Sequence, residues 1–327
     1  MILKNKNIRL LLGICMFMGN VRAAECVQTF KGPEHAATSV VFNANSTILA
    51  FGSLNGDITL WDIENRICLK TWVGHTHLVF SLVFNFDGTT VASGSLDGTI
   101  KLWNTLTGQC MQALEGHDDG AVSSLAFSPD GTILAAGYIG TIKLWNTLTG
   151  QCMQTLEGHD GGVSKLAFNF DGTTLASGSF HGTSKLWNVQ NGECRWILEG
   201  HAGPVNSVIF NLNGTILASG SLDKTIILWD AQTGTHRCKL EGHNSDVRSV
   251  AFSSDGNVLI SVSNDGSIKL WDVETGQCIE TLACHNHYLV SAAFNHDGSI
   301  FASTFFDSTV KLWDLSVFVM PRFKFVD

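Results

Sequence analysis

The sequence predicts an all-β chain that repeats one small unit seven times. Glycine is abundant (33 residues) and proline is scarce (4), a balance that suits many tight turns better than stiff linkers. Tryptophans followed by Asp or Asn recur every 42 residues, at Trp61, Trp103, Trp145, Trp187, Trp229, Trp271 and Trp313. A fixed period of this length is the mark of a repeat architecture.

Each repeat is predicted to form four short antiparallel strands. In the second repeat, apolar alternation covers residues 77–84, 90–95, 99–104 and 109–114, and turns that contain glycine separate these segments. The unit shows no helical period. Four-stranded units repeated radially bury their faces against their neighbours, so the predicted fold is a seven-bladed β-propeller.

The same unit resembles a known family. Gly-His pairs stand near its start, and the Trp-Asp or Trp-Asn pair closes it about 28 residues later. Over residues 25–315, these pairs make the chain similar to the WD-repeat family of β-propellers. The pairs are Gly74-His75, Gly116-His117, Gly158-His159, Gly200-His201 and Gly242-His243, with Cys284-His285 as a variant.

The resemblance also implies how the ring closes. Residues 25–30 align with the fourth-strand segments of later repeats, but they precede the first full repeat. In the family such a strand pairs with the last blade, so we expect residues 25–30 to lie beside residues 309–315. The apolar segment 317–326 is the alternative partner for that edge. The predicted organisation is a single propeller over residues 24–327, with residues 316–327 as a tail.

Residues 1–23 have the layout of a signal peptide. Lys4, Lys6 and Arg9 precede the apolar run LLLGICMFMG, and small residues form a cleavage site before Ala24. The cleaved protein is therefore expected to be secreted or periplasmic. The alternative is a cytoplasmic protein with a packed or disordered leader, because nine cysteines without a bridging pattern suit a reducing compartment.

Four repeats carry His, Ser, Asp and Trp at matching positions. The resemblance implies a hydrogen-bond chain through each set, from Trp to Ser, to His and to Asp. A catalytic triad is the competing interpretation, but it needs one strained, exposed nucleophile with an oxyanion hole. Four copies favour a structural role. The sets are His75, Ser93, Asp97, Trp103; His201, Ser219, Asp223, Trp229; His243, Ser261, Asp265, Trp271; and His285, Ser303, Asp307, Trp313.

The other repeats depart from this pattern. The first has Phe51 in place of the serine, and the third has Ala136 there. The turn that follows in the third repeat is one residue short and lacks the aspartate, while the fourth repeat has His181 at the aspartate position. Blades one and three are therefore predicted to be less rigid than blade two.

An apolar residue precedes the turn aspartate in most repeats. In the family this turn lies on the top face, around the central channel, where partners dock. An apolar ring there predicts a partner-binding surface. The competing interpretation is that these side chains pack over the blade tops or simply belong to the copied template. The residues are Leu54, Leu96, Tyr138, Ile139, Phe180, Leu222 and Phe306.

The predicted function is a non-catalytic protein–protein interaction scaffold that binds a partner peptide or loop across the top face. The alternatives are a detached sensor propeller of a signalling system and a propeller enzyme acting at the channel mouth. A net charge of −9 argues against nucleic acid, and no internal apolar run reaches membrane-spanning length. No cofactor is expected, and His285 with His287, the only tight histidine pair, predicts no metal site. We expect a monomer or a subunit of a larger complex.

Overall fold

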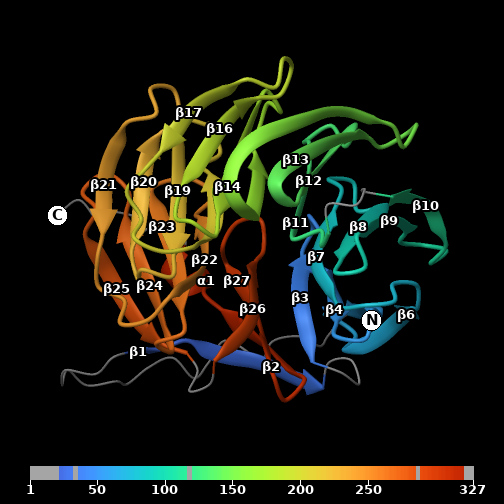
Figure 1. Ribbon diagram of the computed structural model, residues 1–327. Coiled ribbons are helices and arrows are strands. Elements are labelled where there is room, and N and C mark those ends of the chain that lie inside the picture. Colours follow the sequence, from blue (N-terminus) through green and yellow to red (C-terminus); the bar gives the residue numbers. More distant parts are fainter. Residues whose placement is uncertain (1–21, 32–35, 116–119, 285–287, 320–327) are drawn as a thin grey trace, which may run out of the picture.

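The computed structural model describes residues 22–31, 36–115, 120–284 and 288–319. Its strands form blades around a central channel, and the first strand of each blade lines that channel (Figure 1). The one helix among these residues is α1 (Ser316–Val319). The predicted fold class, an all-β propeller with seven four-stranded antiparallel blades, is confirmed.

Blades 1, 2 and 5 each contain four strands that are consecutive in the chain. Blade 1 consists of β3 (Ala37–Phe42), β4 (Ile48–Ser53), β5 (Ile58–Asp62) and β6 (Ile67–Trp72). Blade 2 consists of β7 (Val79–Phe84), β8 (Thr90–Ser95), β9 (Thr99–Asn104) and β10 (Cys110–Glu115). Blade 5 consists of β18 (Val205–Phe210), β19 (Ile216–Ser221), β20 (Ile226–Asp230) and β21 (His236–Leu240).

Blades 3 and 4 share one long strand and form a single seven-stranded sheet. The shared strand is β14 (Cys152–Phe168), whose first part pairs with β13 and whose last part pairs with β15. Blade 3 begins with β11 (Ser124–Phe127), β12 (Ile133–Gly137) and β13 (Ile139–Asn146). Blade 4 ends with β15 (Thr174–Ser179), β16 (Ser184–Asn188) and β17 (Cys194–Leu198).

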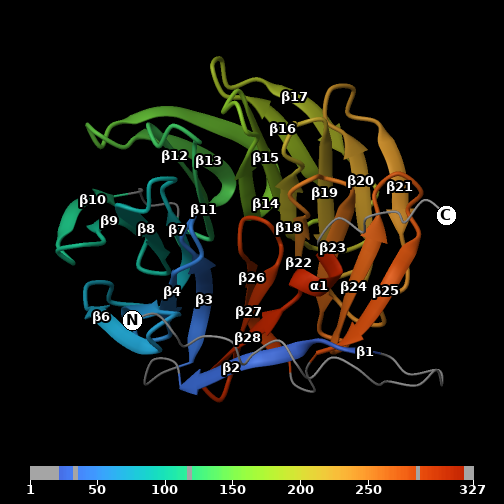
Figure 2. The same ribbon diagram turned by 180° about the vertical axis from the view of Figure 1, so that it is seen from behind.

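The N-terminal strands complete the last two blades. Blade 6 consists of β22 (Val247–Phe252), β23 (Val258–Ser263), β24 (Ser267–Asp272) and β25 (Cys278–Ala283), with the short β1 (Arg22–Ala23) parallel to β25. Blade 7 consists of β26 (Leu289–Phe294), β27 (Ile300–Phe305), β28 (Thr309–Asp314) and β2 (Glu25–Lys31). Figure 2 shows β2, in blue, lying along the red end of the chain.

Ring closure therefore follows the sequence-based prediction. Strand β2 pairs antiparallel with β28, in the register that places Cys26 opposite Trp313 and Lys31 opposite Thr309. Beyond β28 the described part of the tail forms α1. Residues 320–327, most of the alternative segment 317–326, lie outside the described residues. Residues 1–21, nearly all of the predicted signal peptide, lie outside them too.

The turns show why these segments become hairpins. After β7, Asn85 Oδ1 accepts a hydrogen bond from the backbone N–H of Thr90 (2.9 Å), and Asp87 Oδ1 accepts one from the N–H of Thr89 (2.8 Å). Gly88 between them has a φ of 72°, a left-handed conformation that glycine adopts without steric cost. Short polar side chains and one glycine thus fix both the turn and the register of the strands.

The core lies between the blades. Trp103 of blade 2 packs in one cluster with Ile58, Leu60 and Trp72 of blade 1, and the Trp72 and Trp103 rings stack with centroids 5.4 Å apart. The tryptophans of the following repeats occupy equivalent clusters. Truncating a buried tryptophan to alanine typically costs about 3–5 kcal/mol, so the periodic tryptophans are anchors of the blade interfaces.

Candidate functional site

The recurring polar set forms a continuous hydrogen-bond chain in blade 2. Trp103 Nε1 donates to Ser93 Oγ at 2.8 Å, and Ser93 Oγ lies 2.7 Å from His75 Nε2. His75 Nδ1 lies 3.0 Å from Asp97 Oδ2. Because a carboxylate only accepts hydrogen bonds, Nδ1 carries the imidazole proton, and the serine hydroxyl donates to Nε2.

The same chain is present in blades 5 and 6. In blade 5, Trp229 donates to Ser219 (2.8 Å), which lies 2.8 Å from His201, and His201 lies 2.9 Å from Asp223. The corresponding distances in blade 6 join Trp271 to Ser261 (2.8 Å), Ser261 to His243 (2.7 Å) and His243 to Asp265 (3.0 Å).

The charges in these sets are held in fixed protonation states. Burial alone raises the pKa of Asp97, but hydrogen bonds from Thr99 and Thr76 outweigh it and lower this pKa to about 2. The pKa of Asp223 is likewise lowered to about 2. Burial lowers the pKa of His75 despite the attraction of Asp97. Burial likewise lowers the pKa of His201, so at neutral pH the sets of blades 2 and 5 pair a neutral histidine with a carboxylate.

The geometry of the sets does not suit catalysis. The serine hydroxyls of blades 2, 5 and 6 belong to fully buried residues, and each hydroxyl already accepts a hydrogen bond from an indole. A nucleophilic serine has to be reachable by substrate and to lie beside an oxyanion hole. These groups instead satisfy one another's hydrogen bonds inside the blade.

In blade 7 the structure describes only part of the predicted set. Trp313 Nε1 donates to Ser303 Oγ at 2.9 Å, and Asp307 Oδ1 accepts hydrogen bonds from the backbone N–H and the hydroxyl of Thr309. His285 and His287 lie outside the described residues.

The departing repeats lack parts of the chain. Trp61 Nε1 and Trp145 Nε1 have no hydrogen-bond partner among the described residues, as Phe51 and Ala136 stand at the serine position. In blade 4, His159 Nε2 lies 2.6 Å from Ser177 Oγ, but its Nδ1 has no partner in the described part of the chain. Burial, with a contribution from the nearby Lys185 charge, lowers the pKa of His159 to about 4.

The strand order defines two faces. Because every blade repeats the same antiparallel order, the turns between second and third strands share one face with the links between blades. We call this the top face, and the face of the first and third turns the bottom face. Six predicted top-face side chains, which we call the top-face ring, are 44–73% exposed: Leu54, Leu96, Ile139, Phe180, Leu222 and Phe306.

The prediction that Tyr138 belongs to the exposed ring is wrong. The sequence analysis placed it in the exposed ring, but it is fully buried. Its backbone N–H bonds to the carbonyl of Thr141, as that of Ser53 bonds to the carbonyl of Asp57 in blade 1. Tyr138 therefore occupies the buried position at the end of the second strand. The deletion falls after it, which leaves Ile139 alone at the exposed tip.

The bottom face carries apolar side chains that the sequence analysis missed. They lie in the first and third turns of blades 2–5 and are 51–90% exposed: Phe86, Leu106, Leu148, Phe170 and Leu212. The residue before the Asp-Gly or Asn-Gly pair of the first turn is apolar in three of these blades. Reading that position down the repeats, as was done for the second turn, would have found it.

The outer rim carries the periodic cysteines. Each lies on the outermost strand of a different blade with an exposed, unbridged thiol: Cys26, Cys68, Cys110, Cys152, Cys194 and Cys278. Within the described residues, no cluster of three or more His, Cys, Asp or Glu side chains has the proximity that a metal ion requires. The same residues contain no helix long and apolar enough to cross a bilayer.

Comparison with known proteins identifies the family. The WD40 profile, described as "WD domain, G-beta repeat", matches seven segments that span most of the chain: residues 24–62, 66–104, 108–146, 150–188, 192–230, 234–272 and 276–314. The chain belongs to the WD40 repeat family. Each matched repeat supplies the outer strand of one blade and the three inner strands of the next. No curated protein matched the chain.

Proposed function

We propose that this chain is a non-catalytic scaffold that binds an extended segment of a partner protein across the top-face ring. WD40 propellers in general act as protein–protein interaction scaffolds and are typically non-catalytic. One observation carries the finer proposal: the same turn position keeps an apolar side chain exposed in six of the seven blades. Apolar surface of this kind, held open on a rigid fold, is typical of an interaction site.

The seventh position gives the ring a polar gap. In blade 6 the equivalent residue is Asn264, whose Nδ2 donates to Asp246 Oδ2 at 2.9 Å and whose Oδ1 accepts from the N–H of Leu289 at 2.9 Å. Both amide atoms are therefore held by the protein itself. The proposed contact surface is the apolar arc through blades 7, 1, 2, 3, 4 and 5, which suits a segment with spaced apolar side chains.

The test uses peptide binding rather than capture from a cell extract. A random-peptide display library is selected on the immobilised protein, and the affinity of recovered peptides is measured by fluorescence anisotropy. Changing Phe180 and Phe306 together to Asp should weaken these peptides at least tenfold, since the side chains form the contact. The thermal midpoint should stay nearly unchanged, because both side chains are half exposed or more.

A matched control lies on the bottom face. Phe86 and Phe170 are both 64% exposed, so changing both to Asp makes the same chemical change at comparable exposure. This control should bind the selected peptides normally. Loss of binding in the bottom-face variant alone would move the site to that face, and a large loss of stability in the Phe180 and Phe306 variant would make those residues part of the core.

A further inference from the structure

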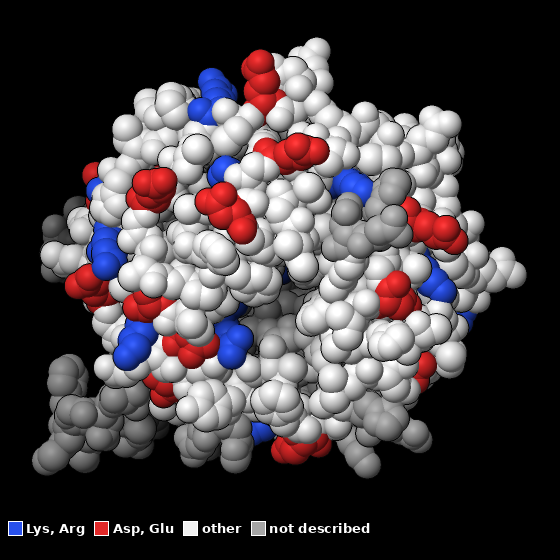
Figure 3. Space-filling view, in the orientation of Figure 1, with Lys and Arg blue, Asp and Glu red and all other residues white. Residues whose placement is uncertain are grey.

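The central channel contains a cavity of about 610 Å³ that the proposed peptide surface does not use. Figure 3 shows the hollow at the centre of one face, with acidic and basic side chains interspersed on the surface around it. The first strands of the blades line the cavity. Its volume falls in the range of small-molecule sites, roughly 300–1,000 Å³.

One position of the first strand breaks the repeat. The position is defined by strand pairing: in blade 2 it is Ser81, which pairs with Gly94 of the second strand, and in blade 4 it is Lys165, which pairs with Gly178. Six blades carry serine there and line the cavity, with Ser39, Ser81, Ser124, Ser207, Ser249 and Ser291. Blade 4 has Lys165 instead. If this residue only stabilised the blade, serine would suffice in every blade. The single lysine therefore needs another explanation.

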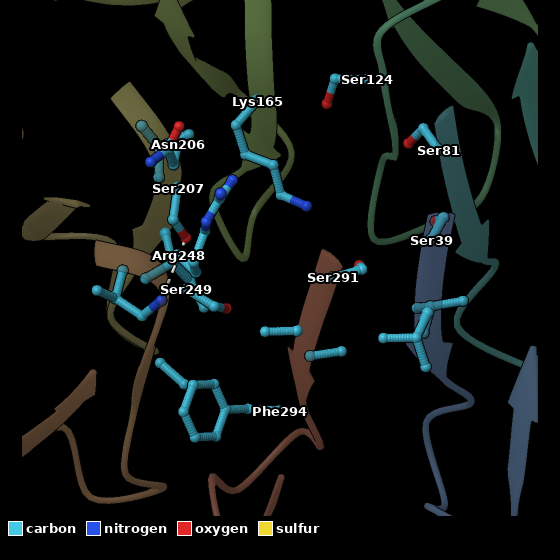
Figure 4. A pocket seen from close by; sticks show the side chains of 18 of the residues that line it. Ser39, Ser81, Ser124, Lys165, Asn206, Ser207, Arg248, Ser249, Ser291 and Phe294 are labelled. Carbon is cyan, nitrogen blue, oxygen red and sulfur yellow. Dashed lines mark hydrogen bonds between the residues drawn. The ribbon is translucent and has the colours of Figure 1, made fainter. Parts of the chain in front are cut away.

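Lys165 is an uncompensated cation inside the channel. Its side chain is directed into the cavity (Figure 4). Among the described residues its Nζ has no hydrogen-bond or ion-pair partner. The residue as a whole is exposed, because it faces the open channel. The protein atoms around it still desolvate the ammonium group and lower its pKa.

The remaining lining supplies further donors. Arg248 also points into the cavity, and only its Nε is engaged, 2.9 Å from Asp246 Oδ2. Ser81 Oγ and Ser124 Oγ each accept a backbone N–H of the next blade at 3.0 Å, which leaves their hydroxyl protons without an acceptor among the described residues. No Asp or Glu belongs to the described lining; its other titratable residue is His296.

We propose that the channel binds a small organic oxyanion, whose phosphate or carboxylate group is held by Lys165 and Arg248 with serine hydroxyls as additional donors. Lys165 has no carboxylate partner among the described residues, and Arg248 pairs with Asp246 through Nε alone. The lining itself contains no carboxylate, so these donors favour an anionic ligand, even in a chain of net charge −9. The cavity is larger than one phosphate group, so an attached organic body also fits. This site is separate from the top-face ring and does not depend on the proposed peptide binding.

Calorimetry of the full chain at low ionic strength tests the proposal. The probes are inorganic phosphate, phenyl phosphate and glutarate, with glutaramide as the neutral counterpart of glutarate. We expect phenyl phosphate or glutarate to bind, and glutaramide to bind at least tenfold more weakly. Absence of binding by all three anions, or equal affinity for glutarate and glutaramide, would overturn the proposal.

Variants locate the site. Lys165→Ser should weaken the anion at least tenfold and should fold, because six other blades carry serine at this position. Lys165→Met, which keeps the side-chain length, should weaken it similarly. The control Lys239→Ser removes a positive charge from the exposed outer strand β21 and should leave affinity unchanged. Full binding by both Lys165 variants, or an equal loss in the control, would place the anion elsewhere.

Discussion

Blades 2 and 3 contain an identical fifteen-residue segment, residues 98–112 and 140–154, but place its tryptophan in different surroundings. Trp103 donates to Ser93 Oγ, whereas Trp145 Nε1 has no partner among the described residues, since Ala136 stands at the serine position. The copied segment thus determines the third strand and its turn. Whether the tryptophan of a blade is hydrogen-bonded depends on residues outside the copied segment.

The lysine of the same segment shows this dependence again. In blade 2, Lys101 Nζ donates to the carbonyl of Gly74. In blade 3, the equivalent Lys143 Nζ lies 5.5 Å from the centroid of the Tyr138 ring, a cation–π contact. This aromatic partner, Tyr138, stands outside the copied segment. Three experiments test this difference between complete and incomplete sets.

Removing the central hydroxyl of a complete set should have the largest effect. Ser93→Ala takes away the acceptor for Trp103 and the donor to His75, both in a buried site. Each buried polar group left without a hydrogen-bond partner costs about 1–3 kcal/mol, so the free energy of unfolding measured in urea should fall by roughly 3 kcal/mol. Ser184→Ala is the matched control, since that buried hydroxyl has no hydrogen-bond partner within the segments that the structure describes. Equal losses in both variants would contradict the structural role of the set.

Acidification should destabilise the incomplete set of blade 4. The pKa of His159 is about 4 in the fold, lowered from 6.5, so the unfolded chain binds the proton first. The stability that neutral His159 contributes is present above pH 6.5 and is lost as the pH falls toward 4. Between pH 7 and pH 5 the loss from this group should be about 2 kcal/mol, measured by urea unfolding at both pH values.

His181→Asp should reduce that loss, because it supplies the carboxylate that His75 has in blade 2 and so raises the pKa of His159. His181→Asn, which fills the same position without a charge, is the control and should keep the wild-type pH response. If the Asp variant lost as much stability on acidification as wild type, a carboxylate at this position would not offset the burial that lowers the pKa of His159.

Adding the missing serine to the set of blade 3 should have the smallest effect. Ala136→Ser provides an acceptor for Trp145 Nε1 and should raise the free energy of unfolding by about 1 kcal/mol. Exchange of the Trp145 indole proton, followed by NMR, should slow in parallel. Ala135→Ser is the control, because its side chain points to the other side of the strand and leaves the indole unpaired. Unchanged stability and exchange in Ala136→Ser would show that the indole has no need of an acceptor.

The sequence predicts the fold well because the fold is repetitive. The tryptophan period, the glycine turns and the early strand at residues 25–30 each specify one feature that the structure contains. The shared strand of blades 3 and 4 was not predicted. There, Ile139 of the shortened turn pairs with Gly162, so residues expected to form a loop continue the strand β14. A deletion is visible in sequence, but how the backbone absorbs it depends on tertiary pairing.

The candidate sites were less predictable, because they too depend on tertiary pairing. Tyr138 could be aligned with either of two positions, and only backbone pairing decides that it is buried. Lys165 drew no notice because a lysine in a polar strand position usually faces solvent. Its position in the channel follows from ring closure, which places the first strand of every blade along a common channel. A departure from the repeat at an inward position is the sequence signal for such a site.

The pairing of β2 with β28 also means that the ring can close only late in biosynthesis. The ribosome makes β2 long before its partner, since 309 − 31 = 278 residues separate their nearest ends. At about 5–20 residues per second, β2 waits on the order of 15–60 seconds with its backbone edge unpaired. Its polar residues Glu25, Gln28 and Thr29 should limit aggregation during this interval, because a polar strand edge is a poor template for pairing with other nascent chains. Strand β28, the last of the described strands to be translated, thus covers the free edge of β2.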